Sequence, residues 1–519
     1  MKRTPFIAGL VAVALLAACS SGDKKSIVDA GNTPTTMASS TTGASTTAGS
    51  STTGAGSSVP GSVGTPTTGA GPTTTAQADI SALPACPTTA LDSASGTVDI
   101  TVWDGFNAGA PQTEFQKLVD QYNASQSKVH VEALVQGEYE DVIAKYLQAG
   151  KGDLPDLVQM PEYMTQTMID TKQSVPVEAC IRADGYDTSP FIDGALLAWN
   201  VGNVQWGMPF NVSDPVLFYN RKVFTAAGLD PDKPPASIDE IREYSQKIIA
   251  SGAAKYGLAL DSGFDSGGGW YLEQWFAQLG EFYADNDNGR TARATKVLYD
   301  DDTGIDLLTQ VQQLVKDGLA MSVGDNATGF DNLLKLADAK EPAAMTINTS
   351  AALSTAIDTV KGGQFPQLTA DDIGIGPLPG PNGAKGAIVG GAAMWMTDSG
   401  NDAKVAATWD FLKYITAAQQ QSQFAADTGY IASRNDARDL DPLKSLLASD
   451  PRFAVAFDQL GLLAGQPTAA GPIIGPLREV RTVAATAVAQ IFAGGDVKTA
   501  LDSAAQQSDS LITDYNARN

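Results

Sequence analysis

Side chains able to perform catalysis are scarce in this sequence. Its 519 residues include one histidine, His130, and three cysteines, so zinc binding and catalysis by Ser-His or Cys-His pairs are nearly excluded. His130 lies in the alternating run 128–132, which is typical of a strand. The acidic run 300–302 lacks the spacing of an EF-hand, and we find no P-loop or nucleophile elbow. We therefore expect no enzyme, no metal and no cofactor, and the alternative is a hydrolase that uses Glu162 with a second carboxylate.

Polar turn-forming residues instead gather between two apolar runs in the middle of the chain. The run 204–208 has the composition of a strand, and Asn211, Ser213 and Asp214 follow it. The run 216–219 then resembles a buried strand. This order predicts that a strand leaves one domain, turns and enters another domain, as at a hinge beside a binding cleft.

The elements before this hinge alternate between strands and helices. The βαβαβ order predicts a parallel sheet with helices on its faces, with the expected strands at 98–103, 129–135 and 156–160 and a helix at 139–148. Ligands of such sheets bind at the carboxyl ends of the strands. The loops at these ends carry Asp104, Glu138, Tyr139 and Glu162.

We expect an α/β fold with two discontinuous lobes that are joined by a hinge of three crossovers. In this scheme the strand at 343–347 returns to the first lobe, and 330–339 forms a helix. The expected N-terminal lobe comprises 98–208 plus 339–389, and the C-terminal lobe comprises 211–338 plus 391–519. Closure of two lobes around a ligand is a known mode of such architectures.

The first residues have the pattern of an export signal. Two basic residues precede the apolar run 6–18, which is too short to span a membrane comfortably. The run ends in Leu-Ala-Ala-Cys19, which resembles the cleavage box of bacterial lipoproteins. We expect 1–18 to be a signal peptide and Cys19 to carry the lipid that anchors the protein on the extracytoplasmic face of the membrane. An ordinary signal with a chance cysteine is the alternative.

A flexible tether is expected at 19–85, since 31–77 contain no charged residue and consist mainly of Ser, Thr, Gly and Ala. The formal net charge of −24 argues against nucleic acid and against electrostatic docking on anionic lipid. With Cys19 lipidated, Cys86 and Cys180 remain as an even pair in an oxidising compartment. We expect them to form a disulfide, and two buried free thiols are the alternative.

The stretch 208–241, MPFNVSDPVLFYNRKVFTAAGLDPDKPPASIDEI, resembles the extracellular solute-binding proteins of ABC importers. It is most similar to the glycerol-3-phosphate and glycerophosphodiester binders, and the resemblance extends from about residue 98 to the C-terminus. It implies a monomer that captures a small polyol phosphate, such as glycerophosphocholine, and delivers it to an ABC permease in the membrane.

The resemblance also implies a set of ligand-binding residues. A second pocket aromatic of some members is absent, because Gly267 stands at its position, and Phe264 is a possible replacement. Thr349 is the alternative to Ser350 if the register differs by one residue. The implied ligand-binding residues are Tyr139, Glu162, Ser213, Trp270, Ser350, Gly390, Gly391, Tyr430 and Arg478.

Among these residues, Arg478 provides the physical argument for an anionic ligand, because guanidinium offers a permanent charge and a bidentate fork to phosphate. The alternative for Arg478 is a pair with a carboxylate such as Glu479 on a surface helix. Alternative functions are an oligosaccharide binder of a sugar ABC importer, a secreted glycoside hydrolase and an adhesin on a Ser/Thr stalk.

Overall fold

The computed structural model describes residues 83–519. The expected signal peptide, Cys19 and nearly all of the tether lie outside the described residues. Within 83–519, no helix combines the length and the apolar character that crossing a membrane requires.

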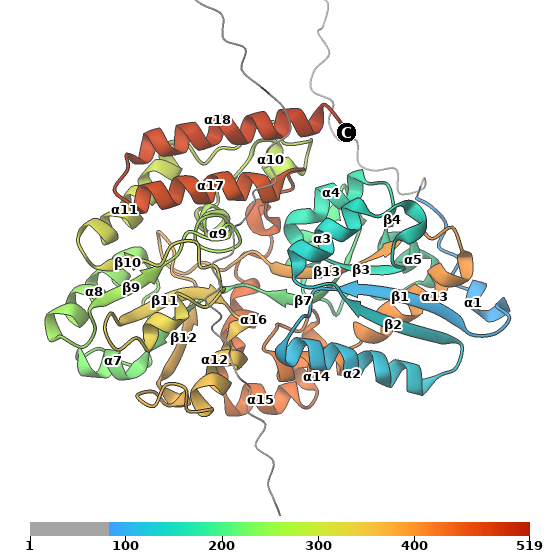
Figure 1. The fold of residues 1–519 in the computed structure, drawn as a ribbon, viewed down its shortest axis with the longest axis horizontal. Helices are drawn as coiled ribbons and strands as arrows, with labels where there is room; N and C mark the ends of the chain where they lie inside the picture. Colours follow the sequence, from blue (N-terminus) through green and yellow to red (C-terminus); the bar gives the residue numbers. More distant parts are fainter. Residues whose placement is uncertain (1–82) are drawn as a thin grey trace, which may run out of the picture. The chain divides into compact units, whose positions relative to one another are not determined.

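The first sheet has the strand order β2-β1-β3-β13-β4, and β7 pairs with β13 beside this path (Figure 1). Strands β1, β2 and β3 are parallel, as their alternation with helices predicts, whereas β13 is antiparallel to β3. Helices α13 and α14 return to this lobe, where α13 packs on β1 and α14 packs on α2. The bounds are β1 Val98–Asp104, α2 Gly109–Ser125, β2 Val129–Val135, α3 Tyr139–Gln148, β3 Leu157–Pro161, β4 Ser174–Val175, β7 Met208–Ser213, β13 Gly390–Thr397, α13 Asp402–Ile415 and α14 Ala418–Thr428.

The second sheet has the order β10-β9-β11-β8-β12. Helices α17 and α18 run side by side over this lobe and contact α11 (Figure 1). The bounds are β8 Pro215–Asn220, α7 Arg221–Ala226, α8 Ile238–Ser251, β9 Tyr256–Leu260, α9 Trp270–Leu279, α11 Asp302–Lys316, β10 Ala320–Ser322, β11 Ala343–Thr349, α12 Ala352–Lys361, β12 Ile373–Pro377, α15 Leu443–Ser449, α16 Ala454–Leu460, α17 Leu477–Phe492 and α18 Val497–Asn516.

Short elements connect these parts. They are α1 Ala90–Ser93, α4 Thr165–Asp170, α5 Val177–Asp184, α6 Asp193–Ala198, β5 Asn200–Val201, β6 Val204–Gln205 and α10 Asp285–Gly289. The turn η3 Glu162–Met164 follows β3 directly and contacts α17 of the second lobe.

Three strands lie in the opposite lobe from the one that the sequence predicts. Strand β11 lies in the second sheet, antiparallel to β8 and parallel to β9, so 343–347 does not return to the first lobe. Strand β12, in the predicted first-lobe segment 339–389, pairs with β8 in the second sheet. Strand β13 lies in the first sheet, beside β3 and β7. Helices α13 and α14, expected in the second lobe, likewise pack on the first. Strands β11 and β13 are almost entirely buried, so neither shows the alternation of buried and exposed residues that would assign one face of a strand to a particular sheet.

The helix expected at 330–339 is only the short turn η4 Leu333–Leu336. Asn332 holds this segment in a loop, because its side-chain amide donates to Asp261 Oδ2 at 3.0 Å and to the carbonyl of Ile347 at 2.8 Å. Its Oδ1 also accepts from the amide of Leu333 at 2.8 Å, so the side chain competes with a regular helix for the local backbone.

The first crossover lies between β7 and β8, close to the predicted hinge, and only Asp214 separates the two strands. The predicted polar turn is wrong in part, because Asn211 and Ser213 belong to β7, and the first lobe extends to 213 rather than ending at 208.

The chain crosses again between β12 and β13 and a third time after α14. These crossings are adjacent, since Ser213 pairs with Gly390, and the amide of Ile431 donates to the carbonyl of Val212 at 2.8 Å.

The predicted disulfide is confirmed. Cys86 and Cys180 are bonded, with their Cα atoms 4.9 Å apart, and the bond ties the segment before β1 to α5.

Candidate ligand-binding cleft

Two cavities that share lining residues lie where the lobes meet. The inner cavity, of about 170 Å³, lies next to the crossovers and is lined by residues of both lobes, among them Ser213 and Gly391. The outer cavity, of about 840 Å³, opens beyond it. Tyr139, Tyr163, Asp265 and Tyr430 line both, so we treat the two cavities as one cleft.

Tyr139 is oriented by a chain of hydrogen bonds from the first sheet. Its hydroxyl accepts from Asn211 Nδ2 at 2.7 Å, Asn211 Oδ1 accepts from Gln159 Nε2 at 2.9 Å, and Gln159 Oε1 accepts from the amide of Gly105 at 2.7 Å. Burial raises the pKa of Tyr139 well above its ordinary value. The hydroxyl therefore keeps its proton at neutral pH and can donate it to an acceptor in the cleft.

A buried arginine that binds two carboxylates lies at the inner cavity, which Arg481 and Glu162 line and Glu273 does not. Arg481, on α17, is 2% exposed, and its Nε and Nη2 donate to Glu273 of α9 at 2.6 and 2.8 Å. Its Nη1 donates to Glu162 Oε1 at 2.9 Å, which links α17 to the first lobe. Burial alone would lower the pKa of Arg481, but the two carboxylates raise it above its ordinary value. We call these three residues the Arg481 triad, and its net charge is −1 when both glutamates are ionised.

Trp270 begins α9 and presents a donor that is not used within the described residues. Its side chain is buried, and Nε1 has no hydrogen-bond partner there. A Cβ at Gly390 would lie 2.3 Å from Trp270 Cζ2, so the indole can pack here only against glycine. Gly391 has φ of +87°, and a Cβ there would lie 2.1 Å from the carbonyl oxygen of Asn211.

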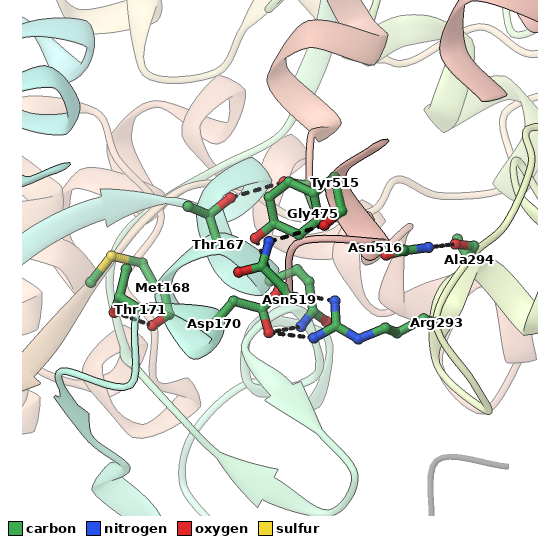
Figure 2. Close-up of polar contacts among 11 residues, drawn as sticks. Thr167, Met168, Asp170, Thr171, Arg293, Ala294, Gly475, Tyr515, Asn516 and Asn519 are labelled. Carbon is green, nitrogen blue, oxygen red and sulfur yellow. Dashed lines mark hydrogen bonds and ion pairs between the residues drawn. The ribbon is translucent and has the colours of Figure 1, made fainter. Parts of the chain in front are cut away.

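A second polar cluster joins the lobes (Figure 2). Asp170, at the end of α4, binds Arg293 with oxygen–nitrogen distances of 3.0 and 2.5 Å and accepts from the Tyr515 hydroxyl at 2.9 Å. Thr167 Oγ1 donates to the carbonyl of Gly475 at 2.9 Å. Helix α4 of the first lobe is thus held to the C-terminal helix of the second lobe.

Comparison with known proteins identifies the family. Residues 117–454 match the family model described as bacterial extracellular solute-binding protein, which is more than half of the chain. The chain belongs to this family.

The solute-binding protein is similar to curated relatives over most of their length. It is 26% identical over 446 residues to the sn-glycerol-3-phosphate-binding periplasmic protein UgpB of Pectobacterium atrosepticum, covering 82% of this chain and 95% of the relative. It is 24% identical over 435 residues to UgpB of Escherichia coli K12, covering 81% and 94%. These relatives confirm the resemblance on which the sequence reading relied.

Solved structures confirm the two-lobed α/β fold. UgpB from Mycobacterium tuberculosis in complex with glycerophosphocholine matches with a TM-score of 0.63 and 20% identity, covering 82% of this chain and 100% of that chain. The cyclic alpha-maltosyl-1,6-maltose binding protein from Arthrobacter globiformis also matches with a TM-score of 0.63 and 20% identity, covering 81% and 100%.

Most of the expected ligand-binding residues of the solute-binding protein lie together. Six of the nine line the inner cavity, namely Tyr139, Glu162, Ser213, Trp270, Gly391 and Tyr430. Gly390 lies directly behind Trp270. Phe264 lines the outer cavity, where its ring lies 6.1 Å from that of Tyr163, so an aromatic side chain three residues before Gly267 does reach the cleft.

Ser350 lies behind the cavity rather than on it. Its Oγ accepts from the amide of Asp214 at 3.2 Å, and its own amide donates to the carbonyl of Asp214 at 2.8 Å. Thr349 lines the inner cavity instead, in agreement with the alternative register.

Arg478 lines neither cavity. Its guanidinium is paired with Glu140, lies 3.6 Å from Glu479 and stands 5.7 Å from the centroid of the Phe264 ring. This agrees with the alternative reading, in which Arg478 pairs with carboxylates. Arg481, about one helical turn further along α17, lines the inner cavity, and a short sequence motif does not indicate which face of a helix is buried.

Sequence reasoning also missed Tyr163 and Asp265. Tyr163 directly follows the predicted Glu162, and Asp265 lies in the loop after β9. Applying the strand-end rule to the second sheet, and not only to the first, would have indicated the loop that carries Asp265.

Proposed function

We propose that this protein is the substrate-binding lipoprotein of an ABC importer, and that it captures glycerol-3-phosphate or a glycerophosphodiester without transforming it. The observation that carries the proposal is the inner cavity at the crossovers, where hydroxyl-bearing side chains, the Trp270 ring, Glu162 and Arg481 converge from both lobes. The similarity to glycerol-3-phosphate binders over nearly their whole length supports the same ligand class.

The residues of the inner cavity suit the two ends of glycerol phosphate. Arg481 binds one carboxylate oxygen of Glu162, so the other oxygen can accept from glycerol hydroxyls. Phosphate oxygens would accept from the hydroxyls of Ser213, Thr349, Tyr139 and Tyr430, and the Trp270 ring would form an apolar wall. Closure of the lobes would remove water from these contacts and strengthen them.

The ligand class can be tested with a thermal-shift panel followed by calorimetry. A ligand at 100 times its Kd raises the stability of the native state by about 2.7 kcal/mol. We expect glycerophosphodiesters to raise Tm and maltooligosaccharides to leave it unchanged. Replacing Trp270 by Leu should remove the shift, whereas Asp306→Asn, on the exposed face of α11, should preserve it. A shift with oligosaccharides alone would refute the phosphate assignment.

An oligosaccharide ligand is the second candidate, and a specific observation favours it. Arg481 is already bound by two carboxylates, so the cavity offers no free cation to a phosphate, whereas neutral hydroxyls suit acidic and aromatic linings. The structural similarity to the maltosyl-maltose binding protein is compatible with this candidate. The panel above separates the two candidates directly.

Membrane attachment through Cys19 and delivery to a permease complete the proposal. The family is extracellular, and the sequence around Cys19 supports lipidation. Cys19→Ala should release the protein from the membrane fraction. Unchanged partitioning of this variant would contradict the lipid anchor.

A further inference from the structure

Two arginines of one second-lobe segment, 285–294, reach the first lobe outside the cleft. Arg293 Nη1 and Nη2 donate to the two carboxylate oxygens of Asp170, at the end of α4, at 3.0 and 2.5 Å (Figure 2). The Asp170 side chain is 8% exposed and also accepts from the Tyr515 hydroxyl at 2.9 Å. Neither Arg293 nor Asp170 lines either cavity of the cleft. This pair therefore joins the lobes without touching the space that a ligand would occupy.

Arg290, three residues earlier, binds carbonyl oxygens on both sides of the lobe boundary. Its Nη1 donates to the carbonyls of Leu197 and Asn200, in the first-lobe segment before β7, at 3.1 and 3.0 Å. Its Nε donates to the carbonyl of Gly471 at 2.8 Å, and its Nη2 donates to that of Ala470. Burial lowers the pKa of Arg290 to about 9, because the guanidinium is held by neutral carbonyls. Separation of the lobes would remove two of these four acceptors.

A left-handed turn positions both arginines. Residues 286–288 have φ between +53° and +60°, and none of them is glycine. This conformation is unfavourable for residues that carry a Cβ, and it persists only where surrounding contacts outweigh the strain. Gly289 completes the turn with φ of +76°, and a Cβ there would lie 2.1 Å from the carbonyl oxygen of Ile473. Asn286 Nδ2 donates to the carbonyl of Arg293 at 2.8 Å, which ties the turn to the arginine.

The same elements of the two lobes meet at this junction and at the inner cavity. Thr167 Oγ1, on α4, donates to the carbonyl of Gly475, just before α17, at 2.9 Å. Further along α17, Arg481 binds Glu162 of the first lobe, and both of these residues line the inner cavity. The arrangement that forms the junction is therefore also the arrangement that brings residues of both lobes to the cavity.

We propose that the segment 285–294 is an interlobe clasp, which holds the lobes in the ligand-binding arrangement and sets the ligand affinity from outside the cleft. The clasp comprises Asp170, Arg290, Arg293 and Tyr515, and these are positioning residues because none of them lines the cleft. A ligand that contacts both lobes favours the same arrangement, so clasp and ligand reinforce each other. The clasp goes beyond the ligand class of the proposed function, because it requires only a ligand that contacts both lobes.

The distance between the lobes tests the clasp without any ligand. Spin labels at Leu147→Cys, on the exposed face of α3, and at Asp306→Cys, on that of α11, report this distance by double electron–electron resonance. Adding Asp170→Asn with Arg293→Met, which leaves no unpaired charge, should populate longer distances. Arg242→Met with Asp317→Asn removes a pair of the same length within the second lobe and should leave the distances unchanged.

The affinity test uses glycerophosphocholine and maltotriose, one probe for each candidate ligand class. The probe that binds the wild type should bind the Asp170→Asn, Arg293→Met variant about fivefold more weakly or worse, because fewer molecules hold the binding arrangement. The Arg242→Met, Asp317→Asn control should bind as the wild type does. A merely structural role of the pair would lower Tm and leave the dissociation constant of the folded protein unchanged.

The turn is tested at Asp287, whose side chain is exposed and whose φ is +55°. Asp287→Val and Asp287→Gly remove the same charge, but a β-branched residue is strongly disfavoured at this φ, whereas glycine accepts it. We expect Asp287→Val to weaken ligand binding about threefold or more and Asp287→Gly to leave it unchanged. Equal affinities of these two variants would overturn the role of the turn.

Unchanged label distances in the Asp170→Asn, Arg293→Met variant, or a dissociation constant within twofold of the wild type, would overturn the clasp, and so would tighter binding. These outcomes leave the proposed function intact. Binding of neither probe by the wild type would overturn the proposed function, and the label distances would then decide on the clasp alone. The two failures are therefore distinguishable.

Discussion

Replacing Arg481 with Met should destabilise the protein strongly, although the two side chains are similar in length. The guanidinium is 2% exposed and Glu273 is 1% exposed, so the variant leaves a buried carboxylate without its partner. Removing one partner of a buried ion pair costs about 3–5 kcal/mol. For a chain of this size, about 1 kcal/mol corresponds to roughly 1–2 °C of Tm, so we expect Tm to fall by about 3–10 °C.

Arg478→Met is the matched control on the same helix. Arg478 is 37% exposed and so is its partner Glu140, so this pair should contribute less than about 1 kcal/mol. Differential scanning calorimetry and urea titration of both variants would compare the two arginines directly. Adding Glu162→Gln and Glu273→Gln to Arg481→Met should restore much of the loss, because no buried charge then remains unpaired.

The pH dependence of Arg481→Met gives an independent check. Without the arginine, burial raises the pKa of Glu162 and is no longer opposed by the guanidinium. A raised carboxyl pKa in the folded state means that the native protein binds more protons, so the deficit should shrink as the pH falls through that pKa. Equal Tm values for Arg481→Met and the wild type, or a larger loss in Arg478→Met, would refute this reasoning.

Three further predictions concern single features of the fold. The double variant Cys86→Ala with Cys180→Ala should lose about 4–5 kcal/mol by the loop-entropy model, and reductant should lower the Tm of the wild type but not of the variant. Gly390→Ala should displace Trp270, cost about 1–3 kcal/mol and weaken ligand binding, whereas Gly152→Ala, where a Cβ meets nothing within 4 Å, should do neither. Burial raises the pKa of Asp104 to about 6 from 3.8, so its ionisation opposes folding as the pH rises through this window. Asp104→Asn should therefore stabilise the protein by about 3 kcal/mol at pH 7–8 and by almost nothing near pH 3, and an equal effect at both pH values would contradict this.

The approximate place of the hinge and the parallel part of the first sheet, formed by β1, β2 and β3, were predictable because local chemistry specifies them. Asn211, Ser213 and Asp214 interrupt two apolar runs, and the βαβ rhythm before them leaves few alternatives to parallel pairing. The lobe of β11 and of β13 was not predictable, because pairing partners of fully buried strands are chosen by tertiary packing.

The residues of the candidate site also divide into those that the sequence could locate and those that only tertiary packing reveals. Residues at the ends of elements that carry a distinctive sequence motif, such as Tyr139 at the start of α3 and Ser213 at the end of β7, lie on the cleft. For neighbouring residues the sequence did not indicate which one faces the cavity. Thr349 lines the inner cavity and Ser350 does not, and on α17 the side chain of Arg481 is buried while that of Arg478 is partly exposed. To identify the buried arginine, one must know which face of α17 points inward, and only its packing against α9 and η3 determines that face.

The position of β13 has a consequence for how this chain acquires its structure after export. β13 lies in the middle of the first sheet, between β3 and β4, yet it is encoded more than two hundred residues after β3. Until residue 397 has emerged, β3 presents an unpaired hydrogen-bonding edge, and the apolar surface that β13 covers is open. A chain that folds from its N-terminus therefore has a half-built first lobe until β13 is available, and exposed apolar surface and unpaired strand edges of this kind favour aggregation. Neither lobe can be produced alone by truncating the chain, because each lobe is built from segments that are separated in the sequence by segments of the other lobe.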